Sequence, residues 1–174
     1  MENQKRNILI SKEDIEEKIS ELGKRISTDY DGKKLYVLSL LRGSFIFTAD
    51  LVRAIDINVK IGFMTTSSYE NNSISSGKVK IVNDVKDSLE GYDVLIVDDI
   101  VDTGITMNFV KEHILKLNPQ SVKTCSLLDK PSRREVTIQP DYCCFSIKDV
   151  FVAGYGLNYG DYYRNVPYIF NFEN

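Results

Sequence analysis

The chain has 174 residues, of which 43% are hydrophobic and 27% charged. These values exclude a disordered chain and predict one globular domain, residues 1–174, with a substantial core. The formal net charge of -3 argues against a surface that coats nucleic acid. The sequence shows neither a signal core after its first residues nor an apolar run long enough to cross a bilayer, so we expect no membrane association and a cytoplasmic protein.

The cysteines and the single histidine offer little chemistry. Cys143 and Cys144 are chain neighbours that cannot readily pair with each other, and no metal-ligand spacing includes Cys125. We predict reduced, buried thiols on strands and a surface or hydrogen-bonded helix position for His113. Catalysis should therefore depend on carboxylates, Lys and Arg.

The first predicted helix begins after Ser11, which forms a capping-box pattern with Asp14. Apolar residues recur at helical spacing up to Ile26, and residues 34–40 then predict a buried strand. The turn that follows, Leu41-Arg42-Gly43-Ser44, leads into a helix predicted over 45–55. Arg42 and the backbone N–H groups at this helix start would form an anion site, although a plain turn with a solvated arginine fits equally well.

Alternating apolar residues predict a strand over 57–66. The polar stretch 65–78 is rich in Ser and Asn, and its composition favours an ordinary hairpin excursion. It is long for a plain hairpin, and long loops in compact domains are often lids or binding loops. The sheet resumes at 79–82.

The stretch from Val94 to Met107 is the most informative part of the sequence. Four apolar residues, 94–97, run directly into Asp98 and Asp99, which predicts a strand buried on both faces. A glycine turn and a helix that ends before Asn118-Pro119 follow. In open α/β sheets, ligands bind at the carboxyl ends of such strands.

The residue types in this turn suggest a ribose phosphate. Gly104 allows backbone N–H groups to approach a ligand, Thr103 and Thr106 add hydroxyl groups, and a helix start suits a phosphate. Asp98 and Asp99 suit a vicinal diol, or Mg²⁺ that retains its waters. The alternative is a buried strand that simply ends in two acids, one of which caps the helix.

Two later strands also end in polar groups. Residues 122–128 predict a strand that leads to a basic loop containing Lys130, which is either a donor to a ligand or a solvated lysine. Residues 142–147 predict another strand, after which alternation favours a core position for Phe151.

The run Val97-Asp98-Asp99-Ile100-Val101-Asp102-Thr103-Gly104-Ile105-Thr106 resembles the phosphoribosyl-pyrophosphate signature of type I phosphoribosyltransferases. An acid at position 102 is similar to the branch that acts on 6-oxopurines, and flanking matches extend over nearly the whole chain. The resemblance implies an α/β fold with a mainly parallel twisted sheet flanked by helices, and a small hood formed by the chain-terminal segments. It also implies transfer of 5-phosphoribosyl to N9 of hypoxanthine or guanine, with Mg²⁺ as cofactor, in a homodimer or homotetramer.

The resemblance further implies roles for single residues. Asp102 would accept the proton at purine N7, either as a general base or as an anchor, and this choice stays open. Asp98 and Asp99 would hold the ribose hydroxyls and help place the metal. The remaining implied contacts are Asp102, Thr103, Gly104, Ile105 and Thr106 for the ribose phosphate, Arg42, Gly43 and Arg164 for pyrophosphate, Ser68 and Tyr69 in the flexible loop, and Lys130, Phe151 and Val152 for the purine.

Two positions depart from the family pattern. The signature in this branch usually begins with Glu where this chain has Asp98, and the usual Leu-Asp-Tyr is Leu157-Asn158-Tyr159 here. Asn158 keeps a carbonyl acceptor without the charge, so it is the weakest of the predicted metal ligands.

Other functions remain as alternatives. A phosphoribosyl-pyrophosphate-binding regulator on the same fold is the main one, although regulators that grip RNA need a basic face. A receiver domain also places acids at a strand end, but the Thr-Gly-Ile-Thr turn has no place in it. Asp102 and Lys130 disfavour orotate and adenine transferases.

Overall fold

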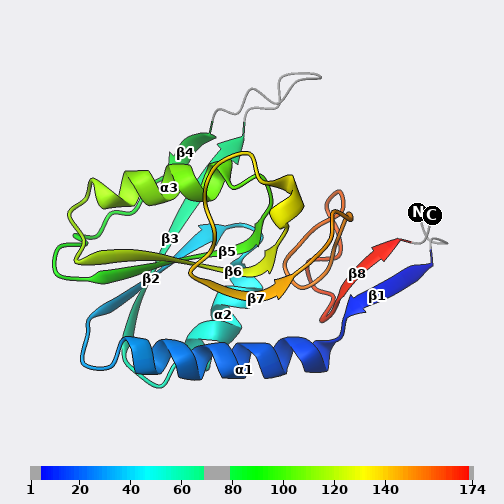
Figure 1. The fold of residues 1–174 in the computed structure, drawn as a ribbon, viewed down its shortest axis with the longest axis horizontal. Helices are drawn as coiled ribbons and strands as arrows, with labels where there is room; N and C mark the ends of the chain where they lie inside the picture. The colour runs from blue at the N-terminus through cyan, green and yellow to red at the C-terminus, as the bar shows by residue number, and fades with distance from the viewer. Residues whose placement is uncertain (1–4, 69–78, 173–174) are drawn as a thin grey trace.

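The structure, a computed structural model, describes residues 5–68 and 79–172. Its centre is a six-stranded sheet with strand order β4-β3-β2-β5-β6-β7, drawn in Figure 1. Only the edge pair β3–β4 is antiparallel, and the remaining neighbours are parallel. The strands of this sheet are β2 (Leu35–Leu41), β3 (Val59–Ser68), β4 (Val79–Asn83), β5 (Asp93–Val101), β6 (Ser121–Asp129) and β7 (Tyr142–Ser146).

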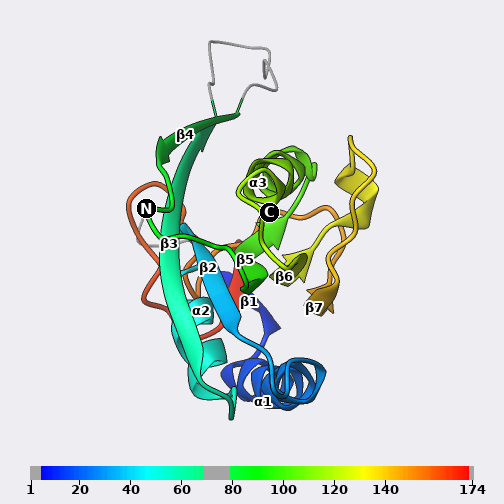
Figure 2. The same ribbon diagram turned by 90° about the vertical axis from the view of Figure 1, so that its left-hand side faces the viewer.

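Helices cover both faces of the sheet. α1 (Lys12–Asp29) and α2 (Phe45–Arg53) lie on one face and α3 (Ile105–Leu115) on the other, as Figures 1 and 2 show from two directions. A short 3-10 helix, η1 (Pro131–Arg133), follows β6. The capping box is confirmed, because the Asp14 backbone N–H donates to Ser11 Oγ at 3.1 Å.

The central strand has the environment that its sequence predicts. Leu95 and Val97 pack into the apolar cluster beneath α1 and α2, whereas Val94 and Ile96 pack into the cluster beneath α3. None of the four has measurable solvent exposure. A strand that is apolar on both faces is stable only between two layers of helices, so β5 lies at the middle of the molecule.

The two chain ends form the predicted hood. β1 (Arg6–Ile10) pairs antiparallel with β8 (Ile169–Phe172), and the pair stands beside the main sheet in Figure 1. Aromatic rings hold the hood together: the Tyr163 ring centroid lies 5.5 Å from that of Phe170, and the Arg6 guanidinium lies 5.0 Å from the Tyr163 centroid. The confirmed fold is therefore a mainly parallel sheet flanked by helices, with a terminal hood.

Some local predictions were wrong. β3 continues to Ser68, beyond the predicted end at 66, because β4 pairs with its last residues and supplies partners for their backbone groups. α2 ends at Arg53 rather than 55. Cys125 is buried as predicted, but Cys143 is exposed, since β7 is an edge strand of the sheet.

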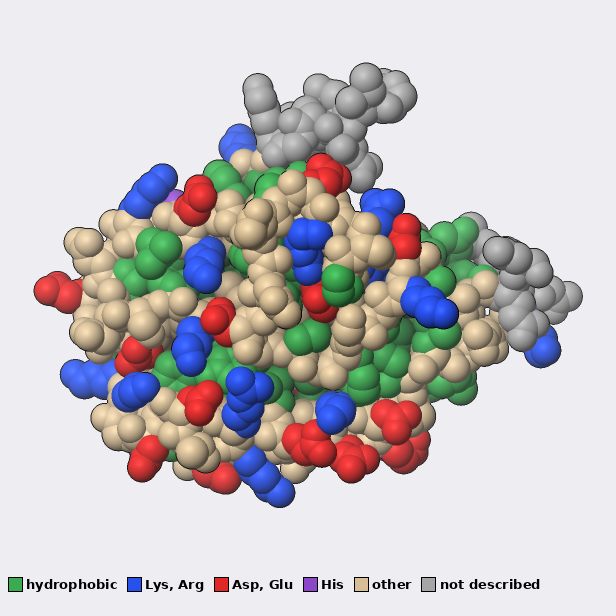
Figure 3. All heavy atoms as spheres, in the orientation of Figure 1, with side chains coloured by type: hydrophobic (Ala, Val, Ile, Leu, Met, Phe, Trp, Pro, Cys, Tyr) green, Lys and Arg blue, Asp and Glu red, His purple; other side chains and the backbone are tan. Residues whose placement is uncertain are grey.

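The environment of the histidine matches expectation. His113 lies in the last turn of α3, where its Nε2 is 2.9 Å from Asp84 Oδ2. Side chains of both charge signs are interspersed over the face in Figure 3. Among the described residues, no helix combines the length and the apolar character needed to span a membrane.

Candidate active site

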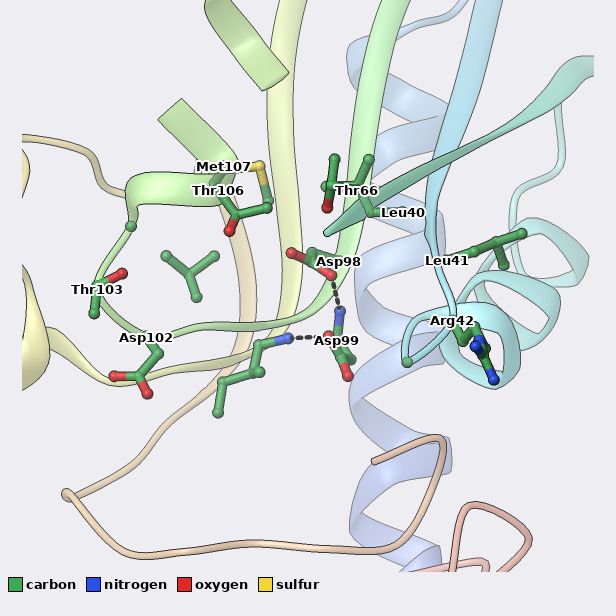
Figure 4. Close-up of a pocket in the computed structure, with 14 residues that line it drawn as sticks. Leu40, Leu41, Arg42, Thr66, Asp98, Asp99, Asp102, Thr103, Thr106 and Met107 are labelled. Atoms are coloured by element: carbon green, nitrogen blue, oxygen red, sulfur yellow. Dashed lines mark hydrogen bonds between the residues drawn. The ribbon is translucent and has the colours of Figure 1, made fainter. Parts of the chain in front are cut away.

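A first cavity opens where the chain changes direction across the sheet. From β2 the chain proceeds outward to β3 and β4, then returns to β5 on the other side of β2. Such a switch point leaves a crevice at the carboxyl ends of the strands. A cavity of about 250 Å³ lies there, between the turn that follows β2 and the turn that follows β5 (Figure 4).

Two adjacent carboxylates form the floor of this cavity. Asp98 Oδ1 accepts a hydrogen bond from the Asp99 backbone N–H, and Asp99 Oδ1 accepts one from the Ile100 N–H, both at 3.0 Å. Burial and the neighbouring Asp99 charge raise the pKa of Asp98 well above its usual value, and burial also raises the pKa of Asp99. Ionising both acids is therefore unfavourable until a hydroxyl donor or a cation joins them.

The β5–α3 turn supplies the anion side of the cavity. Gly104 has φ of +84° and directly precedes α3, a conformation that glycine adopts without strain. Thr103 Oγ1 accepts a hydrogen bond from the Ile105 N–H at 3.4 Å, and both Thr103 and Thr106 line the cavity. The first N–H groups of α3 have no partners within the helix, so the turn suits a phosphate.

The β2–α2 turn closes the opposite side. A Cβ on Gly43 would lie 1.7 Å from Asp99 Oδ2, so only glycine permits this approach of the two turns. In Figure 4, Asp98 and Asp99 lie between Thr103 on one side and Arg42 on the other. These two turns are far apart in the sequence, and the parallel pairing of β2 with β5 brings them together.

A second cavity, of about 550 Å³, adjoins the first and shares Leu41, Arg42 and Thr66 with it. Arg164 and Asn158 line this second cavity from the hood side. Arg164 Nη1 donates to the Gly156 carbonyl oxygen at 2.5 Å, which fixes the guanidinium group. The structure thus brings Arg42, Arg164 and Asn158 together, and it places Asn158 apart from the Asp98–Asp99 pair.

The predicted purine residues lie at the ends of β6 and β7. Lys130 is only 7% exposed, so the solvated-loop interpretation of this lysine is wrong. Phe151 is 57% exposed, so the core position that its alternation favours is also wrong. Its ring meets Tyr159 edge-on with centroids 5.4 Å apart. Within the described residues, the backbone N–H and C=O of buried Val152 have no protein partner, which leaves them available to a ligand.

Asp102 points away from the other two acids and has a partner that sequence analysis missed. Its Oδ1 accepts a hydrogen bond from Arg133 Nε at 3.1 Å. Arg134 Nη1 donates to the Asp102 carbonyl oxygen at 2.7 Å and pairs with Asp129. The sequence could have indicated Arg133 and Arg134, because both belong to the basic run 130–134. This run follows β6, whose carboxyl end lies beside that of β5.

Thr66 was also missed. It lies in the strand predicted over 57–66, and the structure places it along both cavities. The register pairs Leu41 with Thr65, so the end of β3 lies beside the β2–α2 turn. Of the predicted flexible-loop residues, Tyr69 lies outside the described residues, and for Ser68 only its position at the end of β3 is described.

Comparison with known proteins identifies the family. The family model described as a phosphoribosyl transferase domain matches residues 8–160. The chain belongs to the phosphoribosyltransferase family. This result agrees with the placement of the acid pair and the glycine turn in one cavity.

Several members of the family are similar to this chain in both sequence and length. The chain is 43% identical over 162 residues to the hypoxanthine-guanine phosphoribosyltransferase of Bacillus subtilis, covering 93% of this chain and 90% of that protein. The Lactococcus lactis protein of the same name is 47% identical over 162 residues, covering 93% of this chain and 88% of its own. A crystal structure of a Staphylococcus aureus hypoxanthine phosphoribosyltransferase superimposes with a TM-score of 0.92 at 41% identity, over 96% of this chain and 91% of that one.

Longer relatives contain the same phosphoribosyltransferase-like region. The chain is 43% identical over 169 residues to the bifunctional protein TilS/HprT of Listeria monocytogenes. The match covers 97% of this chain and spans only 26% of that relative.

Proposed function

We propose that this chain is a purine salvage enzyme that transfers the 5-phosphoribosyl group of phosphoribosyl pyrophosphate to N9 of hypoxanthine and guanine. The products are the 6-oxopurine nucleotides IMP and GMP, and pyrophosphate. The observation that carries the proposal is that the acid pair and the phosphate turn share one cavity, while two arginines line the cavity that adjoins it. On the side of Asp102, the buried Lys130 pairs with Asp149, two positions before the exposed Phe151.

Each part has a role in the reaction. The β5–α3 turn (Thr103, Gly104, Ile105 and Thr106) binds the 5′ phosphate through its N–H groups and hydroxyls. Asp98 and Asp99 accept hydrogen bonds from the ribose hydroxyls. Arg42, Gly43 and Arg164 hold the pyrophosphate, whose negative charge grows as the bond to ribose C1 breaks.

The acid pair also fits Mg²⁺. Burial and then the neighbouring Asp99 charge raise the pKa of Asp98, so a bound cation would stabilise the ionised acid, and carboxylate oxygens are the ligands that Mg²⁺ prefers. When bound, Mg²⁺ would neutralise pyrophosphate charge. Asn158, in the adjoining cavity, is at most a weaker, neutral ligand.

The purine end explains the choice of base. Lys130 can only donate, so it favours a 6-oxo group over a 6-amino group. Phe151 offers a face for stacking, and the Val152 backbone offers a donor and an acceptor to the base edge. Asp102 accepts the proton at N7 as the bond to N9 forms.

Assembly and location complete the proposal. We infer a single domain over residues 1–174, which acts in the cytoplasm as a homodimer or homotetramer. The single-activity relatives described above are named as transferases, which favours the enzyme over a phosphoribosyl-pyrophosphate-binding regulator.

A panel of purines tests the proposal. The protein is incubated with phosphoribosyl pyrophosphate, Mg²⁺ and each of hypoxanthine, guanine, xanthine and adenine, and nucleotide is measured by chromatography. We expect product from hypoxanthine and guanine, little from adenine, and none when EDTA removes the metal. Product from no base, together with binding of phosphoribosyl pyrophosphate, would support the regulator instead.

A further inference from the structure

Four side chains of alternating charge run along the purine side of the site. Asp102 Oδ1 is 3.1 Å from Arg133 Nε, and Arg133 Nη1 is 3.7 Å from Asp149 Oδ2. Asp149 Oδ1 is in turn 3.9 Å from Lys130 Nζ. The series therefore connects the acid proposed to meet N7 with the lysine proposed to meet O6.

Four separate segments contribute to this series. Asp102 lies in the turn after β5, Lys130 follows β6, Arg133 ends η1, and Asp149 lies between β7 and Phe151. Backbone hydrogen bonds join these segments near the strand ends: the Lys130 N–H donates to the Val101 carbonyl oxygen and the Glu135 N–H to the Thr103 carbonyl oxygen, both at 2.9 Å. Ion pairs between exposed side chains are weak, and the side chains of Arg133 and Asp149 are 47% and 53% exposed. Lys130 is buried and Asp102 is half-buried, so the protein constrains the two ends of the series.

Arg133 occupies only one oxygen of Asp102. In the part of the chain that the structure describes, no donor is paired with Asp102 Oδ2. The backbone of Asp102 is held separately, because Arg134 donates to its carbonyl oxygen. Arg134 thus secures the turn and Arg133 orients the side chain, so loss of Arg133 should leave the turn intact.

We propose that Arg133 is a positioning residue for the purine step. It holds Oδ1 of Asp102 so that Oδ2 faces the proton at N7, and through Asp149 it keeps Lys130 in place for O6. A base oriented by a third group is a recurring arrangement in enzyme sites, and small misplacements of a catalytic group reduce turnover strongly. This inference rests on the proposed transferase function.

The test compares Arg133→Gln and Arg133→Lys with a control on α1, Arg25→Gln. Arg25 forms a longer ion pair of 4.0 Å with Asp29, and its side chain is 64% exposed. We expect Arg133→Gln to lower kcat by ~10-fold and to leave the KM for phosphoribosyl pyrophosphate within ~2-fold, because only the purine end is disturbed. Arg133→Lys should recover part of the loss, since lysine keeps the charge without the planar fork. Arg25→Gln should match the wild type.

A double-mutant cycle with Asp102→Asn separates orientation from general structural damage. If Arg133 acts through Asp102, Arg133→Gln should change kcat by less than ~2-fold in the Asp102→Asn background. The same ~10-fold loss in both backgrounds, or normal kcat in Arg133→Gln, would overturn the inference. A wild type that makes no nucleotide would instead overturn the proposed function.

Asp149→Asn provides a second variant that leaves Arg133 and Asp102 paired. We expect it to raise the KM for hypoxanthine more than it lowers kcat, since it disturbs Lys130 and not the acid. Melting curves followed by circular dichroism establish that each variant is folded. If Arg133→Gln does not fold, Arg133→Lys and Asp149→Asn decide: unchanged kinetic constants in both would overturn the inference.

Discussion

The two turns that face each other across the first cavity have the same local architecture and opposite charge. Each follows a buried parallel strand, contains a glycine and leads into a helix: β2–Gly43–α2 in one case and β5–Gly104–α3 in the other. The β2 turn carries Arg42, whereas the end of β5 and the turn after it carry Asp98, Asp99 and Asp102.

The difference shows how the same strand–turn–helix arrangement can bind two different parts of a ligand. Both helix starts favour anions. In the β2 turn the added cation reinforces that preference, which suits a pyrophosphate. In the β5 turn the acids precede the helix start, so N–H groups and carboxylates face different parts of the ligand. A sugar phosphate has the matching arrangement, with hydroxyls at one end and an anion at the other.

The largest effect is expected in the β5 turn. Asp102→Asn should lower kcat by ~100-fold or more, the usual contribution of a general base, with little change in the KM for phosphoribosyl pyrophosphate. Asp31→Asn, at an exposed position after α1, serves as the control. Near-normal turnover of hypoxanthine in a steady-state assay would remove Asp102 from the mechanism.

A smaller effect is expected in the β2 turn. Arg42→Gln removes a charge-assisted contact worth about 1.5–3 kcal/mol, so kcat/KM for phosphoribosyl pyrophosphate should fall by ~10- to 100-fold. The matched variant Arg53→Gln, at the end of α2 and 73% exposed, should have no such effect. Equal values of kcat/KM for the two variants in initial-rate measurements would show that the turn does not hold the pyrophosphate.

The smallest effect concerns stability. The pKa of Asp98 is raised in the folded chain, mainly by burial and then by Asp99, so ionisation of Asp98 opposes folding. This cost is absent below the unfolded pKa of about 3.9 and grows as pH rises through the folded pKa. Without metal at pH 8, Asp98→Asn should therefore melt about 2–4 °C above the wild type, equivalent to ~1 kcal/mol.

Changes in pH and in Mg²⁺ concentration test this interpretation in the same melting experiment. The difference in melting temperature between Asp98→Asn and the wild type should vanish near about pH 3.5, where both side chains are neutral. At pH 8, this difference should become smaller when Mg²⁺ is added. A wild type that melts above Asp98→Asn at pH 8 without metal would contradict the interpretation of the acid pair.

The sequence alone determined the elements whose signals are local. An apolar run buried on both faces predicted β5, the Ser11–Asp14 pair predicted the start of α1, and the signature from 97 to 106 predicted the chemistry of one turn. These signals depend on neighbours in the chain, so sequence was sufficient to detect them.

Tertiary structure decided which turns meet and which side chains are buried. Alternation favoured the core for Phe151, yet it is exposed, and composition allowed a solvated Lys130, yet it is buried. The parallel pairing of β2 with β3 placed Thr66 beside the turn after β2 and so at the cavity, and Arg133 contacts Asp102 across 31 positions of sequence. Such contacts arise from the parallel alignment of strand ends, which depends on the whole sheet and not on any one segment.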